Sequence, residues 1–285
     1  MHLNKNIHTF IGCDSEYADA SMVLFGAPFD STTSFRPGTR FASSAIRNES
    51  FGLETYSPYQ DKDLLDYAVF DGGDLELPFG SPENALMQIS DYTKQILADG
   101  KLPVMLGGEH LVTLGAVRSA VEKYPDLHIL HFDAHADLRA DYLGMTLSHA
   151  TVIRRTWELV GDGKIFQFGI RSGEKAEFTW AKEHLSMRKF NLAGLEQVVT
   201  KLQGKPIYLT IDLDVLDPGI FPGTGTPEAG GVSFMELLDA ICLAGKLNII
   251  ACDMNELAPI YDQSGASTAL ACKLLRELLL AIGKN

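Results

Sequence analysis

The chain has 285 residues, of which 46% are hydrophobic and 21% are charged, a composition typical of a globular protein. Its 24 basic and 37 acidic residues give a formal net charge of -13, which argues against nucleic acid as a partner. Four widely spaced cysteines match neither a zinc motif nor a disulfide framework. The N-terminus lacks the apolar core of a signal peptide, and no apolar run is long enough to span a membrane. We therefore expect a cytoplasmic protein that binds neither membranes nor nucleic acid.

Residues 1–21 are polar and weakly patterned, and we expect them to form a surface arm. From residue 22 onward, short apolar runs alternate with segments of helical periodicity. The expected strands are 22–28, 68–77, 102–110, a run beginning at 127, 164–171, 187–190, 206–218 and 248–257. The expected helices are 39–50, 82–100, 110–124, 148–161, 174–185, 191–204, 232–246 and 264–283.

This alternation of strands and helices predicts a parallel sheet covered by helices. We find no break in composition and no linker, so we expect a single domain over residues 1–285. Eight strand–helix units also fit a closed barrel, and periodicity alone does not choose between the two folds. In both folds the functional site lies at the carboxyl ends of the strands.

Three of the expected strands end in side chains that bind metals. The third ends in the motif GGEH, the fourth in FDAHAD, and the seventh carries two aspartates separated by one residue. In an extended backbone, side chains at alternate positions point to the same side. The set comprises four carboxylates and two imidazoles: His110, Asp133, His135, Asp137, Asp212 and Asp214. One such aspartate alone is as often a helix cap or turn residue, but the combined pattern favours a metal site.

The chemistry of this set indicates two metal ions. Carboxylates that flank an imidazole on one face would repel each other unless a cation lay between them. Mixed nitrogen and oxygen ligands in this number suit a pair of divalent ions better than a closed zinc site. Two ions about 3.5–4 Å apart can share a water molecule and lower its pKa towards ~7. The sequence therefore predicts a dinuclear hydrolytic centre.

The motifs resemble those of the ureohydrolase family, which comprises arginases and agmatinases. The resemblance covers nearly the whole chain and includes GAPFD, RPGTRFASSAIR, GGEH, FDAHAD, IDLDVLDP, GTGTPEAGG and DMNELAP in this order. It implies a three-layer α/β/α sandwich with a central eight-stranded parallel sheet, and so decides against the barrel. It also implies a homotrimer or homohexamer that hydrolyses a guanidinium group to urea and an amine.

The family's functional residues can be carried over by position. The resemblance implies two Mn²⁺ ions per chain, held by the six side chains named above. It implies that His149 transfers a proton to the leaving amine, and that Glu256 pairs with the guanidinium of a small cationic substrate. We read His131 as a residue that orients a metal ligand.

The residues expected near the substrate tail depart from the arginase pattern. Arginases usually have an asparagine where this chain has Arg139, and acidic residues where it has Ser172 and Gly173 after Arg171. These departures favour agmatine, hydrolysed to putrescine and urea in polyamine biosynthesis. A basic residue near the tail would instead favour a guanidinobutyrase or another guanidino-compound ureohydrolase, and Arg139 leaves that alternative open. A non-catalytic regulatory relative is disfavoured because all six metal ligands are present.

Overall fold

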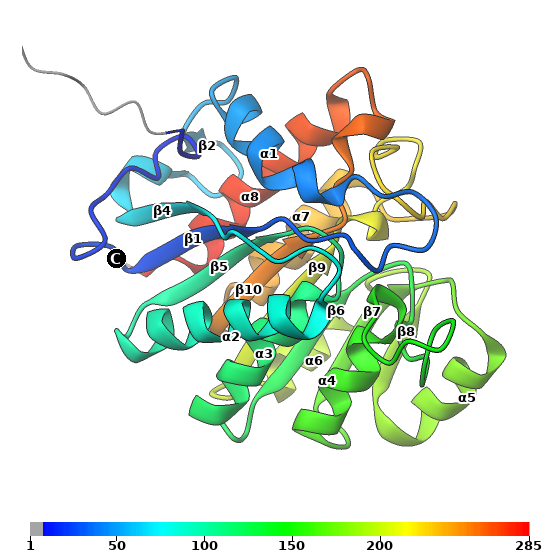
Figure 1. The fold of residues 1–285 in the computed structure, drawn as a ribbon. Coiled ribbons are helices and arrows are strands. Elements are labelled where there is room, and N and C mark those ends of the chain that lie inside the picture. Colours follow the sequence, from blue (N-terminus) through cyan, green and yellow to red (C-terminus); the bar gives the residue numbers. More distant parts are fainter. Residues whose placement is uncertain (1–7, 285) are drawn as a thin grey trace, which may run out of the picture.

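The centre of the protein is an eight-stranded sheet in which every pair of neighbouring strands runs parallel (Figure 1). The computed structural model describes residues 8–284. In spatial order the strands are β4 (Val69–Asp74), β1 (Met22–Ala27), β5 (Leu102–Gly107), β10 (Asn248–Asn255), β9 (Pro206–Asp212), β6 (His128–Phe132), β7 (Ile165–Ile170) and β8 (Ser186–Lys189). The sheet is open, because β4 and β8 form its two edges. The predicted eight-stranded parallel sheet is therefore confirmed, and the barrel is excluded.

Helices cover both faces of the sheet (Figure 1). One face carries α2 (Pro82–Ala98), α3 (Val112–Lys123) and α4 (Val152–Val160), and α5 (Lys175–His184) lies beside β8. The other face carries α1 (Ala42–Ser50), α6 (Leu195–Lys201), α7 (Phe234–Ala244) and α8 (Ala266–Ile282). Single-turn 3₁₀ helices are η1 (Thr39–Phe41), η2 (Leu64–Asp66), η3 (His149–Thr151), η4 (Leu213–Val215) and η5 (Pro259–Tyr261). The result is the predicted three-layer α/β/α sandwich.

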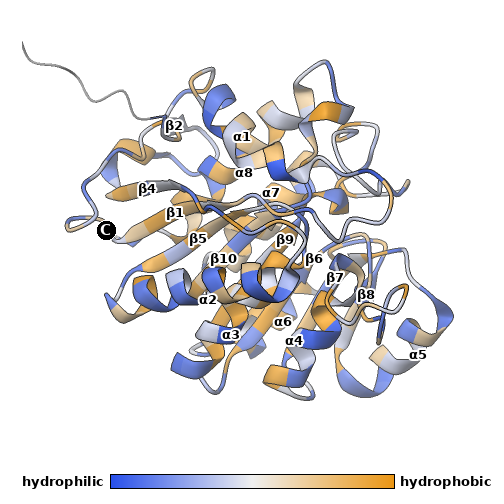
Figure 2. Ribbon diagram, in the orientation of Figure 1, coloured by the Kyte–Doolittle hydropathy of each residue, from blue (hydrophilic) through white to orange (hydrophobic). Residues whose placement is uncertain are grey.

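The alternation of side chains along each strand creates two apolar cores, one on each face. In β1, Met22 and Leu24 pack towards α1 and α8, whereas Val23 and Phe25 pack towards α2 and α3. Figure 2 shows the strands as mostly hydrophobic and the outer helix surfaces as more hydrophilic. Because full burial of such a side chain contributes about 1.5–3 kcal/mol, the two cores fix the sheet between its helices.

The order of the strands brings distant parts of the sequence to one place. The last strand, β10, lies between β5 and β9, and β6 follows β9. Their carboxyl ends are adjacent, since Asn255 pairs with Asp212 and Ile211 pairs with Phe132. Ligand sites of open parallel sheets lie at such carboxyl ends. The metal-binding motifs therefore meet at the middle of this edge.

Two parts of the fold differ from the sequence prediction. A small antiparallel hairpin of β2 (Tyr56–Ser57) and β3 (Lys62–Asp63) was not expected. Within the expected surface arm, residues 1–7 lie outside the described part, but Phe10 and Cys13 are fully buried. The prediction of an arm is therefore wrong for this portion, because one aromatic ring anchors it in the core. Across residues 8–284, no helix has the length and apolar character needed to cross a membrane.

Candidate metal centre and active site

The ends of β6, β9 and β10 turn sharply, and these turns aim the polar side chains. β6 ends at Phe132 and β9 at Asp212, so the prediction that the strands continue through Asp137 and Asp214 is wrong. Asp137 and Glu256 adopt left-handed backbone conformations, with φ of 53° and 67°. Such a conformation costs a non-glycine residue about 1–2 kcal/mol, and strain of this kind is concentrated at functional sites. The side chains converge by tight turns rather than by extended alternation.

The first group of predicted ligands surrounds His110. Its Nδ1 lies 3.1 Å from Asp133 Oδ2, 3.1 Å from Asp137 Oδ2 and 3.5 Å from Asp212 Oδ2. All four side chains are buried. One imidazole nitrogen and three carboxylate oxygens from three different strands therefore meet at one point.

The opposite nitrogen of His110 indicates how the ring is protonated. Nε2 lies 2.9 Å from Thr210 Oγ1. A hydroxyl oxygen carries lone pairs, so Thr210 can accept the Nε2 hydrogen of His110. The lone pair of Nδ1 then faces three carboxylates, an arrangement of acceptors without a donor. A cation satisfies this arrangement.

The second group surrounds His135. Its Nδ1 lies 2.9 Å from Asp214 Oδ2 and 3.7 Å from Asp133 Oδ1. Asp214 Oδ2 is buried and takes part in no hydrogen bond, although its other oxygen accepts one from the amide of Ala134. Asp133, His135 and Asp214 offer ligand atoms within 4.8 Å of one another. Asp133 directs one oxygen to each group, which is how a bridging ligand would lie, so the geometry fits two ions.

His131 also lies close to Asp133, but its hydrogen bonds indicate a supporting role. The amide nitrogen of Gln167 donates to the carbonyl of Ala136 and lies 3.1 Å from His131 Nδ1. Because an amide nitrogen only donates, Nδ1 accepts and the proton is on Nε2. Nε2 lies 2.8 Å from Asp133 Oδ2 and so donates to it. His131 thus orients a predicted ligand.

The ionised form of the buried carboxylates in the site is energetically unfavourable without a nearby positive charge. Burial raises the pKa of Asp137 to about 7, with a further contribution from the charge of Asp133. Burial and neighbouring carboxylates also raise the pKa of Asp212 and of Glu256 well above their usual values. Within residues 8–284, no lysine or arginine forms an ion pair with these groups. Bound cations would keep the carboxylates ionised at neutral pH.

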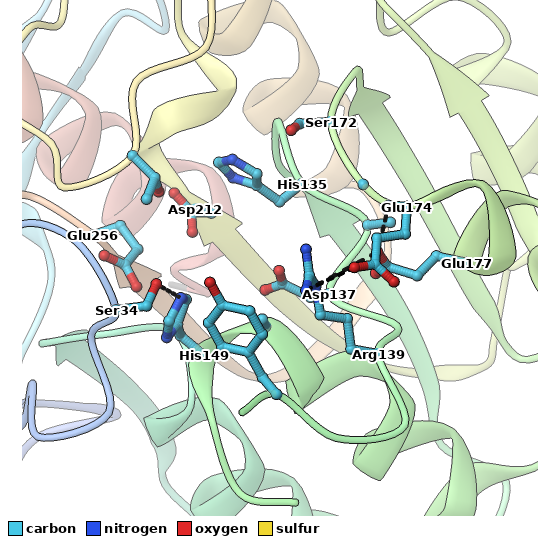
Figure 3. A pocket seen from close by; sticks show the side chains of 15 residues that line it. Ser34, His135, Asp137, Arg139, His149, Ser172, Glu174, Glu177, Asp212 and Glu256 are labelled. Carbon is cyan, nitrogen blue, oxygen red and sulfur yellow. Dashed lines mark hydrogen bonds and ion pairs between the residues drawn. The ribbon is translucent and has the colours of Figure 1, made fainter. Parts of the chain in front are cut away.

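A cavity of about 270 Å³ opens above the two groups, with room for a small molecule (Figure 3). Glu256, Asp212 and His149 line it, and His149 lies beside Ser34. Glu256 Oε1 accepts a hydrogen bond of 2.7 Å from the amide of His110, and the carboxylate also lines the cavity. Burial lowers the pKa of His149 to about 4, so its ring is neutral at pH 7.

The contacts of Arg139 show where its side chain points at the far end of the cavity. Its guanidinium lies 3.0 Å from Glu174 Oε1 and 3.9 Å from Glu177 Oε2, and it stacks over the Tyr142 ring at 4.5 Å. Figure 3 shows Arg139 directed towards these two glutamates. The carboxylate of Glu177 already accepts hydrogen bonds from the amides of Leu138 and Glu174. The far end therefore carries two acidic groups and one paired basic group.

Several residues around the site were not identified from the sequence. Thr210 and Gln167 lie inside apolar strands, where a single polar residue was the available signal. Thr32 and Ser34 lie in a loop after β1 and contact His149 from 117 and 115 residues away in sequence. Glu109, within GGEH, is fully buried beside that loop. Its place between two glycines and a metal-binding histidine was the available signal.

The chain is similar to known proteins over almost its whole length. A model of the arginase family matches residues 20–281. An agmatinase of Bacillus subtilis (strain 168) is 49% identical over 279 residues, which cover 96% of each chain. The N(1)-aminopropylagmatine ureohydrolase of Thermococcus kodakarensis is 38% identical over 93% of this chain and 92% of its own. A crystal structure from Clostridium difficile, provisionally described as an agmatinase, has a TM-score of 0.92 and 53% identity, covering 94% of this chain and 99% of that chain.

Proposed function

Because this chain belongs to the arginase family and is an agmatinase-type ureohydrolase, we propose that it hydrolyses agmatine to putrescine and urea with two Mn²⁺ ions. The 49% identity to an agmatinase supports the substrate. The two groups of buried ligands support the pair of ions. Manganese suits a set of carboxylates and imidazoles with this composition.

Each ion has its own proposed ligands, and one carboxylate is shared. His110, Asp137 and Asp212 would hold the first ion and His135 and Asp214 the second, and Asp133, which lies near both groups, would contribute to both. When bound, the ions supply a hydroxide nucleophile at neutral pH by lowering the pKa of a shared water. Loss of the carboxylate of Asp133 or of Asp214 should therefore abolish turnover rather than weaken substrate binding.

The remaining steps belong to the chain's own side chains. Glu256 pairs with the N–H groups of the guanidinium and holds its central carbon over the metal ligands. His149 Nε2 carries no proton at pH 7, and it accepts a proton from the nucleophile as the nucleophile adds to the guanidinium carbon. It returns this proton to the nitrogen of the leaving amine as the carbon–nitrogen bond breaks. An unprotonated amine would be a very poor leaving group, so this transfer is required.

The observation that favours agmatine is the charge at the far end of the cavity. Arg139 is paired with Glu174, and the two glutamates there outnumber it. The ammonium of agmatine fits this negative end. The carboxylate of arginine or 4-guanidinobutyrate would require Arg139 to leave Glu174, and it would otherwise be buried without a partner. Among residues 8–284, Arg139 is nevertheless the one arginine or lysine that lines the cavity, so guanidinobutyrase activity is the second candidate.

Substitution of Arg139 separates these two candidates. We expect Arg139→Ala to keep kcat/KM for agmatine within about 3-fold of wild type or to raise it, because Glu174 becomes free to pair with the ammonium. The assay is urea release from agmatine and from 4-guanidinobutyrate. Arg118→Ala is a matched control, since Arg118 forms a surface ion pair with Glu83. If wild type prefers 4-guanidinobutyrate and Arg139→Ala removes that activity, the protein is a guanidinobutyrase.

We extend the same proposal to the organisation of the protein. We propose a single domain over residues 1–285, a homotrimer or homohexamer, and a cytoplasmic role in polyamine biosynthesis. Light scattering of the Mn²⁺-loaded protein tests the assembly, since a monomeric mass would contradict it.

A further inference from the structure

Glu109 is a buried acid for which the proposed mechanism has no use. It is fully buried next to His110, yet its side chain faces away from the metal ligands. Its carboxylate accepts hydrogen bonds from the Thr32 amide at 2.8 Å, from the Thr32 hydroxyl, and from the Thr33 hydroxyl at 3.2 Å. All three donors come from the loop that follows β1. Glu109 therefore fixes this loop to the end of β5.

The loop can approach Glu109 because Gly108 has no side chain. A Cβ atom on Gly108 would lie 1.9 Å from the carbonyl oxygen of Phe29, which is far inside contact distance. The Glu109 amide donates a hydrogen bond of 2.7 Å to that same carbonyl. Gly108 thus lets the backbones that follow β1 and β5 run together past the end of the sheet.

Thr32 connects this anchored loop to His149 at two atoms. The His149 amide donates a hydrogen bond of 3.1 Å to the Thr32 hydroxyl, and His149 Nδ1 lies 3.0 Å from the Thr32 carbonyl. The hydroxyl donates its own hydrogen to Glu109, so it can accept the one from His149. A carbonyl only accepts, so Nδ1 carries the proton and Nε2 is left as the acceptor. Ser34 Oγ lies 3.2 Å from Nε2 at the cavity wall.

We propose that Glu109 and Thr32 are positioning residues that hold His149 with its basic Nε2 directed into the cavity. This inference rests on the proposed role of His149 in agmatine hydrolysis. The chain of contacts runs from a buried carboxylate, through a hydroxyl, to the backbone and ring of the proton-transferring histidine. It links the turn that carries a metal ligand to the group that must reach the leaving nitrogen. A displacement of about 1 Å in such a group can lower a rate by ~100-fold.

Three variants of the loop test the proposal. Thr32→Val removes the shared hydroxyl and keeps the side-chain volume, whereas Thr32→Ser keeps the hydroxyl. Thr33→Val is the matched control, because it removes one donor to Glu109 from a residue that makes no hydrogen bond to His149. We expect Thr32→Val to lower kcat for agmatine by about 10–100-fold with KM within about 3-fold of wild type. Thr32→Ser should restore most of kcat, and Thr33→Val should stay within about 3-fold.

Amide hydrogen exchange at His149 gives a readout that does not depend on activity. In Thr32→Val this amide loses its acceptor, so its exchange should accelerate by about 10-fold or more, and in Thr33→Val it should not. Equal kcat values for Thr32→Val and Thr33→Val would overturn the proposal. So would a loss of bound metal in Thr32→Val, because the effect would then pass through the ligands. If wild type releases no urea from agmatine, the proposed function fails, while the exchange rates still decide whether Thr32 holds His149.

Discussion

Removal of the metal ions should destabilise the protein much more at pH 8 than at pH 5.5. Without ions, the buried carboxylates must either take up protons or remain charged in an apolar environment. Burial raises the pKa of Asp137 to about 7, and it raises the pKa of Asp212 and of Glu256 in the same direction. With ions bound, the carboxylates are ionised and paired at both pH values. The pH dependence of the chelated protein therefore reports whether these groups share one cation site.

The sign and size of the effect follow from Asp137. In the unfolded chain an aspartate has a pKa of about 3.9, so between about pH 4 and pH 7 only the folded, metal-free protein holds this proton. The free energy of unfolding therefore falls as the pH rises through this range and is constant above it. From pH 5.5 to about pH 7 this is a difference of about 1.5 pH units, which at ~1.4 kcal/mol each corresponds to about 2 kcal/mol. For a protein of this size, that is roughly 4 °C in Tm.

The assay is thermal unfolding of Mn²⁺-loaded and EDTA-treated protein at several pH values. The gap in Tm between the two forms should widen from pH 5.5 to about pH 7.5 and then level off. Asp137→Asn is the control, since an amide does not titrate, and its chelated form should lose much of this pH dependence. A gap that stays the same at every pH would refute the argument that buried, protonated carboxylates replace the ions.

Three further substitutions test other parts of the site. Asp214→Asn should lower urea release by orders of magnitude and reduce the metal content below two ions per chain, measured by elemental analysis. His149→Ala should keep both ions but lower kcat by about 10²–10⁴-fold, and an unchanged kcat would show that His149 is structural. Gly108→Ala should lower the free energy of unfolding by about 1–3 kcal/mol, because its Cβ would lie 1.9 Å from the Phe29 carbonyl. Gly52→Ala is its control in the same melting assay, since the nearest atom there is 3.3 Å away.

The sequence predicted the sheet and the identity of the polar strand ends because both depend on local patterns. Apolar runs separated by helical periodicity define eight strands without any knowledge of their neighbours. The motifs around His110, Asp133 and Asp212 follow three of these runs directly. A parallel sheet places all such ends on one edge, so convergence could be expected before the strand order was known.

Features that depend on distant contacts or on tight turns were not predicted. The strands β2 and β3 have two residues each, too few for any periodicity to be visible. The contact between Thr32 and Glu109 spans 77 residues, and no local pattern connects a threonine in a loop with an acid in a glycine-rich turn. The left-handed backbone of Asp137 was also hidden, because aspartate in a sequence gives no sign of the conformation that its neighbours impose.

The central claim, hydrolysis of agmatine in preference to other guanidino compounds, is tested most directly by competition. Mn²⁺-loaded protein is incubated with equal, low concentrations of agmatine, arginine and 4-guanidinobutyrate, and mass spectrometry follows the loss of each. Their relative rates give the ratios of kcat/KM in a single experiment. We predict that agmatine disappears at least ~100-fold faster than either competitor, with putrescine and urea formed in equal amounts. Equal or faster loss of arginine or 4-guanidinobutyrate would contradict the assignment of the substrate.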